Sequence, residues 1–183
     1  MTIRDLINEY QTAATAGVVV VICATLGILV WTTVGQSGTG VENAYFYDLE
    51  SDEIFVGKTA QDPPIIGPSG ERAGVRAYVY ACGQCPPKDE LVGLNWRELE
   101  QTPAFIAYFQ RYSDRMLDLR ASGRSLEELD QADQAYMVQE RGDLVRAPDD
   151  ERWVPRASRH AARLLSPGPR PCPGDEPLVI CHP

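Results

Sequence analysis

Four cysteines carry most of the chemistry that this chain offers. Cys82 and Cys85 form a C-x2-C pair in the segment VRAYVYACGQCPPKDELVG, and Cys172 and Cys181 lie near the carboxyl end. A fifth, Cys23, falls within an apolar stretch, where a small apolar side chain is expected. Four thiols in this pattern can be joined as disulfides, bind zinc as thiolates, or act as a redox-active dithiol.

Disulfides are favoured if this part of the chain lies outside the cytoplasm, because thiols pair in an oxidising compartment. Four cysteines allow three connectivities, and their spacing does not select one of them. A bond from the C-x2-C pair to the tail would close a loop of nearly a hundred residues, worth about 4–5 kcal/mol through chain entropy. We therefore predict a disulfide framework made of Cys82, Cys85, Cys172 and Cys181.

Zinc is the alternative use of the same four residues. Two intervening residues let the sulfurs of Cys82 and Cys85 face one metal ion, and Gly83 eases the turn between them. Cys172 and Cys181 are eight residues apart, wider than the second pair of a zinc ribbon, although His182 or His160 could replace one of them. No cofactor is the main expectation, and zinc is the alternative to it.

A redox-active dithiol at Cys82 and Cys85 is the third alternative and the main enzymatic one. C-G-x-C after a strand is similar to the thioredoxin motif, whose attacking cysteine is activated at a helix amino terminus. Here Pro86, Pro87 and then KDE follow the pair, where a thioredoxin-like protein continues into a long helix. The chain contains no G-x-S-x-G, H-E-x-x-H or phosphate-binding glycine loop. We therefore expect no catalytic residue.

The elements that must position the cysteines form an α+β domain over residues 42–183. Two β-rich runs around ESDE predict a hairpin over Ala44–Gly57, and alternation predicts a strand over Val75–Cys82. A further short strand is expected in LVGLNW, which is Leu91–Trp96. The predicted fold is a short antiparallel sheet with two or three helices beside it.

Helical spacing and capping residues predict where those helices lie. Thr102 caps a first helix, with Pro103 at its first position, and this helix runs until Gly123. A capping box made by Ser125 and Glu128 begins a second helix, LEELDQADQAYMVQE. The tail is mostly loop, with a short helix over Arg156–Leu165 and a last extended piece, PLVIC.

An apolar stretch precedes this domain. No charged residue occurs between Glu9 and Glu42, and Ala13–Val34 is about 22 residues long, or roughly 33 Å of helix, enough to cross a bilayer. A cleavable signal peptide would have a shorter apolar run and a clear small-x-small site. We predict an amphipathic lead-in over residues 1–11, a transmembrane helix over 12–34 and a flexible linker over 35–41.

Charge indicates the orientation and excludes one class of partner. Arg4 and the amino terminus precede the span, and no basic residue follows it until Lys58, which favours a cytoplasmic amino terminus and an extracytoplasmic domain. The formal net charge of −9 is unsuited to binding nucleic acid. The expected partners are the lipid bilayer, through Ala13–Val34, and other membrane protein subunits.

An anchor is followed by AYFYDLESDEIFVG, then by PPI, GVRA and the C-x2-C pair, and the chain closes with PCPG and CHP. In this layout the chain resembles uncharacterised single-pass membrane proteins of planctomycete-type bacteria. The resemblance implies a recurring arrangement of anchor, β-rich start and four-cysteine framework, and it implies no activity. We expect a membrane-anchored accessory subunit with an extracytoplasmic interaction domain. An envelope thiol–disulfide oxidoreductase and a zinc-ribbon-like binding module are the alternatives.

Overall fold

The computed structural model describes residues 42–166, 172 and 176–183. The predicted lead-in, transmembrane helix and linker lie outside these residues. None of the helices in the described ranges has the length and apolar character needed to span a bilayer.

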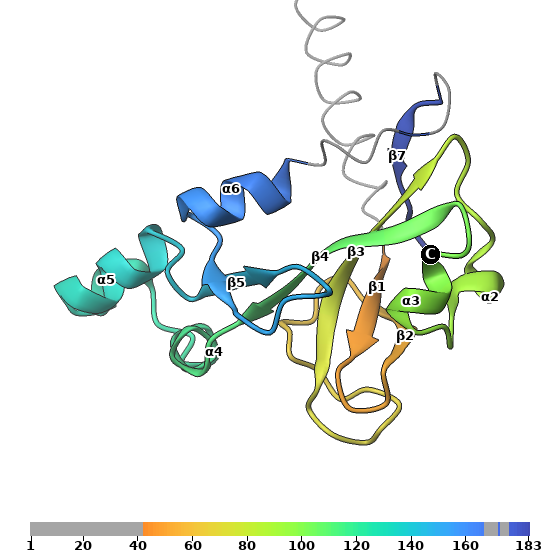
Figure 1. Cartoon of the computed structure of the whole chain (residues 1–183). Helices are drawn as coiled ribbons and strands as arrows, with labels where there is room; N and C mark the ends of the chain where they lie inside the picture. Colours follow the sequence, from red (N-terminus) through yellow and green to blue (C-terminus); the bar gives the residue numbers. More distant parts are fainter. Residues whose placement is uncertain (1–41, 167–171, 173–175) are drawn as a thin grey trace, which may run out of the picture. The chain divides into compact units, whose positions relative to one another are not determined.

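The domain is built on one antiparallel sheet, which confirms the predicted α+β class. Its central strands run in the order β2-β1-β3-β4-β5-β6, and β7 pairs with β3 as well (Figure 1). The strands are β1 Asn43–Asp48, β2 Glu53–Lys58, β3 Gly74–Cys82, β4 Ala104–Tyr112, β5 Asp143–Arg146, β6 Val154–Pro155 and β7 Leu178–Ile180.

The hairpin predicted over Ala44–Gly57 is confirmed as β1 and β2. Asp48 is the last residue of β1, directly before the turn, and its side chain has no exposed surface. The Asp48 carboxylate accepts hydrogen bonds from the backbone N–H groups of Glu50, at 3.0 Å, and Ser69, at 2.8 Å. Because these amides lie in two different segments, the buried carboxylate joins the hairpin turn to the loop that leads into β3.

The helix predicted from Pro103 to Gly123 is wrong over its first half, where the chain forms β4. A bulge explains the error. Tyr78 lies opposite Tyr108 and Val79 lies opposite Ile106, so Ala107 is an extra residue in β4. The extra residue reverses the in–out alternation, and Ile106 and Phe109 therefore contribute to the same core. Their spacing of three residues is also the spacing of a helix face, so the hydrophobic pattern fits both structures.

The helices that form are short. They are α2 Lys88–Leu91, α3 Trp96–Leu99, α4 Asp114–Ala121, α5 Gln131–Val138 and α6 Arg159–Leu165, with a 3₁₀ turn, η2, over Leu126–Glu128. The capping box of Ser125 and Glu128 is present, but it caps η2, and α5 has a separate N-cap, Asp130. The short tail helix is confirmed as α6, and PLVIC supplies β7.

Two predictions about extended structure are corrected. The strand expected over Leu91–Trp96 is replaced by the end of α2 and the start of α3, with Gly93 between them at a φ of 87°. Only Gly93 and Leu94 form strand-like hydrogen bonds with β2. The Gly93 N–H donates to the Ile54 carbonyl at 2.8 Å, and the Ile54 N–H donates to the Leu94 carbonyl at 2.9 Å. In the tail, which the sequence assigns mainly to loop, β5 and β6 extend the sheet beyond β4.

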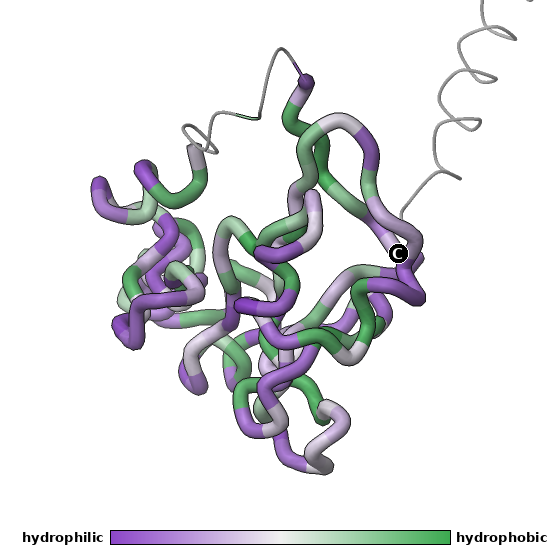
Figure 2. The backbone as a smooth tube through the Cα atoms, turned by 45° about the vertical axis from the view of Figure 1, so that its right-hand side comes forward, coloured by the Kyte–Doolittle hydropathy of each residue, from purple (hydrophilic) through white to green (hydrophobic). Residues whose placement is uncertain are grey.

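The two faces of the sheet have separate cores. On one face, strands β1, β3 and β4 pack against α2 and α3 through the buried side chains of Leu91 and Leu99. On the other face, α6 covers β4, β5 and β6, where Tyr108, Val145 and Ala161 are buried. The alternation of hydrophobic and hydrophilic colour along the tube in Figure 2 reflects this arrangement, since successive strand residues point to opposite faces.

Candidate functional site

The structure joins the four cysteines in two disulfides, which supports the disulfide interpretation. Cys82 is bonded to Cys172, and Cys85 is bonded to Cys181, over sequence separations of 90 and 96 residues. The C-x2-C pair is therefore split between two bonds and does not form the internal disulfide that a redox-active C-x2-C motif forms. In the described residues no group of three or more cysteine, histidine or acidic side chains is arranged to hold a metal ion.

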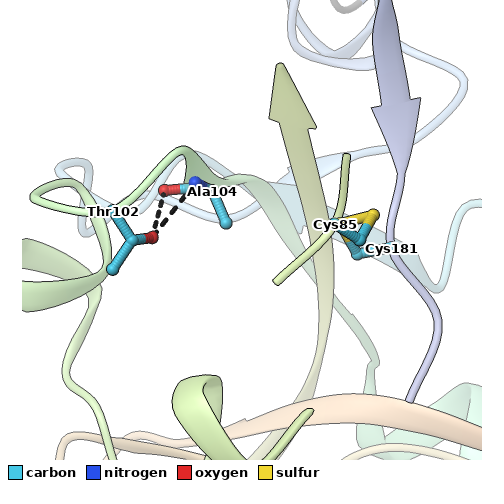
Figure 3. The surroundings of a disulfide bond; sticks show 4 residues. All are labelled: Cys85, Thr102, Ala104 and Cys181. Carbon is cyan, nitrogen blue, oxygen red and sulfur yellow. Dashed lines mark hydrogen bonds between the residues drawn. A yellow bond between two sulfur atoms is a disulfide. The ribbon is translucent and has the colours of Figure 1, made fainter. Parts of the chain in front are cut away.

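Both disulfides fasten the tail to the end of β3. Cys82 is the last residue of β3, and Cys181 directly follows β7, which pairs with β3 through Tyr80 and Ile180. Figure 3 shows the Cys85–Cys181 bond beside β7 and, across from it, Thr102 at the start of β4. The Thr102 hydroxyl accepts a 3.0 Å hydrogen bond from the Ala104 amide, so this residue caps the beginning of a strand instead of a helix.

A pocket lies next to the Cys85–Cys181 disulfide, in a gap at one edge of β3. The pairing of β1 with β3 ends at Phe46 and Arg76, and the pairing of β7 with β3 begins at Tyr80 and Ile180. Because β4 occupies the other edge of β3, β1 and β7 share one edge (Figure 1). Ala77, Tyr78 and Val79 lie between the two ladders. A cavity of about 100 Å³ occupies this gap.

The walls of this pocket, which we call the β1–β7 pocket, are mainly apolar. Tyr45 of β1, Ala77 and Val79 of β3, and Cys181 are all buried and belong to the larger core. Ile180 is 43% exposed and forms part of the rim. The pKa of Tyr45 is raised, first by burial and then by the negative charge of Asp89, so its hydroxyl stays neutral at physiological pH.

Two basic side chains, Arg76 and His182, line the same pocket. The Arg76 guanidinium lies 5.5 Å from the centre of the Phe46 ring and donates hydrogen bonds to the backbone carbonyls of Thr59 and Gln61. In the described part of the chain, no carboxylate forms an ion pair with Arg76, and its buried Nε has no acceptor. The exposed His182 directly follows Cys181, so the disulfide restrains the backbone at this residue.

A second group of polar residues links strands β3, β4 and β5. The Tyr78 hydroxyl donates to the side-chain carbonyl of Gln110 at 2.6 Å, and the Gln110 amide donates to the Asp143 carboxylate at 2.8 Å. Arg156 forms an ion pair with the same carboxylate at 3.4 Å. Each of these side chains forms a hydrogen bond or ion pair with the next one. The network therefore joins β3, β4 and β5 and has a structural role.

The sequence analysis grouped the four cysteines that the structure joins in two disulfides, but it missed the other pocket residues. Arg76 and Tyr45 carry no spacing signal, because they come together only when β1 and β7 meet the same edge of β3. Gln110 and Asp143 were missed for a related reason, since residues 103–112 read as a helix and the tail read as a loop. A buried polar residue within an apolar strand would have been the only signal.

Searches of family models, of curated proteins and of solved structures give no match for this chain.

Proposed function

We propose that this protein is a membrane-anchored accessory subunit that presents an extracytoplasmic interaction domain to a larger membrane assembly. Ala13–Val34 would cross the bilayer, and the domain that begins near Glu42 would lie outside the cytoplasm. The linker of about seven residues between them reaches at most roughly 25 Å, so the domain would stay close to the membrane surface.

The pair of disulfides is the observation that carries this proposal. Disulfides persist in oxidising compartments and are rare in the cytosol. Both bonds here tie the tail to β3 and hold β7 and His182 in place, so the domain depends on them for the part of its surface that contains the β1–β7 pocket. A surface that is held rigid by disulfides and contains a preformed pocket is suited to binding a neighbouring subunit at the membrane.

The two lysines of the chain allow a direct test of the orientation. Lys58 and Lys88 are the only lysines, and both are exposed on the domain. A sulfonated amine-reactive biotin reagent that cannot cross the inner membrane should label the protein in intact spheroplasts. The variant carrying Lys58→Arg and Lys88→Arg should lose this label, because the amino terminus would be cytoplasmic. Labelling that requires lysis of the spheroplasts would contradict the proposed location.

Membership of an assembly needs a separate experiment. The full chain should be extracted in mild detergent and should migrate on a native gel well above the size of one copy, together with other membrane proteins. Cross-linking before extraction, again through Lys58 and Lys88, should retain the same neighbours. Migration as a lone monomer, with and without cross-linking, would contradict the accessory role.

A further inference from the structure

We propose that the β1–β7 pocket binds the carboxyl-terminal aliphatic residue of a partner polypeptide. This inference rests on the proposed role as an interaction domain and names the kind of segment that the domain would bind. Three features of the pocket support it: its size, the free edge of β3 inside it, and the charges at its rim.

The size of the pocket matches one aliphatic side chain. A closed apolar cavity of about 150 Å³ holds a benzene molecule. The β1–β7 pocket has a cavity of about 100 Å³ and is walled by Tyr45, Ala77 and Val79. A side chain of valine or leucine size would fill this space and remove apolar surface from water.

The backbone of β3 offers main-chain hydrogen bonds inside the pocket. Along one edge of an antiparallel strand, alternate residues direct both their N–H and their C=O outward. Val75 faces Tyr47 of β1, and the carbonyl of Val79 accepts the N–H of Cys181 at 2.8 Å. Ala77 lies between them on the same alternation, so its C=O, like the N–H of Val79, points toward the gap between the two ladders.

The short length of this free edge favours a chain end over an internal strand. Three residues, Ala77, Tyr78 and Val79, separate the ladder with β1 from the ladder with β7. A strand that added to β3 here and continued in both directions would run into β1 or β7. A polypeptide that ends in the gap can pair with Ala77 and stop there, as in other sites that capture a carboxyl terminus at a sheet edge.

The charges at the rim favour a free carboxylate on that last residue. Arg76 and His182 both line the pocket, and Arg76 has no ion-pair partner in the described residues. The chain carries a net charge of −9 and repels anions in general. A terminal carboxylate would therefore be held by the guanidinium of Arg76, and added salt would weaken its binding.

Peptide binding to the full chain in nanodiscs tests the proposal. The probe is a fluorescein-labelled Gly/Ser hexapeptide ending in Gly-Leu with a free carboxylate, followed by fluorescence anisotropy. The same peptide with a carboxyl-terminal amide should bind with an affinity lower by about tenfold or more, because a hydrogen bond to a charged group is lost. A peptide ending in Gly-Gly should lose a similar factor, because it leaves the pocket empty. Equal binding of all three peptides, or binding of none, would overturn the proposal.

Variants separate the pocket from the remaining surface. Arg76→Gln should lower affinity for the free-acid peptide toward that of the amide, and Arg76→Lys should retain most of it. Ala44→Leu at the pocket wall should block binding while both disulfides remain formed. Arg97→Gln is the matched control, since Arg97 is exposed on α3 and stacks on Trp96 instead. If Arg97→Gln weakens binding as much as Arg76→Gln, the pocket is not the site.

The peptide experiment and the lysine labelling test the two proposals separately. If the lysine labelling gives the expected orientation and no peptide binds, the pocket assignment falls and the accessory role stands. If the lysines react only after lysis, the accessory role falls whatever the peptides do.

Discussion

The side-chain amide of Gln110 donates a 2.8 Å hydrogen bond to the carboxylate of Asp143, and only 5% and 6% of these two residues are exposed. Gln110 lies in β4 and Asp143 begins β5, so the bond joins two neighbouring strands. Burial is the largest influence on the Asp143 carboxyl and raises its pKa, although Gln110 and Arg156 act in the opposite direction.

Replacing Asp143 with Asn should change how stability depends on pH. Because the native pKa of Asp143 is raised, its contribution is fully present below the ordinary pKa of about 4 and is lost as pH rises through the native pKa. The free energy of unfolding of Asp143→Asn, relative to wild type, should therefore increase as pH rises. Urea unfolding at several pH values measures it. Asp149→Asn, at an exposed position, is the control, and a constant difference for Asp143→Asn would refute the prediction.

Asp48 should show the opposite pH dependence. Burial acts to raise its pKa, but hydrogen bonds from Ser69, Glu50 and Ser51 outweigh burial and lower it. Its contribution is present above the ordinary pKa and is lost as pH falls through the native pKa. Asp48→Asn should cost about 2 kcal/mol at pH 7, and the cost should shrink in acid. The same urea series checks this, and a cost that grows toward low pH would contradict it.

The two disulfides should not contribute equally when they are removed in turn. Each closes a loop of more than 90 residues in an otherwise open chain, worth about 4–5 kcal/mol by chain entropy. Once Cys82–Cys172 is closed, however, Cys85–Cys181 closes only about a dozen further residues, worth about 3 kcal/mol. We therefore expect that a double Cys→Ser variant lacking one disulfide loses less than half of the stability that is lost when both disulfides are removed.

Thermal unfolding of the two double variants and of the quadruple variant measures these losses. Intact mass with and without reductant, together with metal content, supplies the control for the state of the thiols. Wild-type protein should be oxidised and free of zinc. Reduced protein with one equivalent of zinc would contradict the disulfide framework.

Trp153 should hold two arginines of like charge together. The guanidinium groups of Arg111 and Arg146 lie 4.6 and 5.1 Å from the centre of its ring. Burial and the charge of Arg111 lower the pKa of Arg146, which shows that the two cations repel one another. Trp153→Leu should cost about 2 kcal/mol, because both cation–π contacts are lost.

Salt provides the distinguishing measurement for this variant. Added salt screens the repulsion between Arg111 and Arg146, which the tryptophan no longer offsets. The stability of Trp153→Leu should therefore rise with ionic strength more steeply than that of wild type. Trp96→Leu is the matched control, since Trp96 contacts the single guanidinium of Arg97 at 5.1 Å. An equal salt response in both variants would argue against the prediction.

Local sequence was sufficient for the elements that depend on neighbours along the chain. The alternating residues on both sides of ESDE predict the β1–β2 hairpin, because turn residues and a period of two act within a few residues. The same is true of β3, of α6 and of the last strand at PLVIC. The capping box of Ser125 and Glu128 was identified from the sequence, but it caps a 3₁₀ turn instead of the long helix that was predicted.

Tertiary contacts decided what the local pattern left open. β4 is a strand with helical hydrophobic spacing, because the bulge at Ala107 reverses its alternation and only the pairing with β3 reveals it. The four cysteines suggested a disulfide framework, but their partners were set by β7, which brings Cys181 to Cys85 and Cys172 to Cys82. The pocket of Arg76 and His182 exists because β1 and β7 meet one edge of β3 from residues far apart in the chain, a relationship that no local pattern encodes.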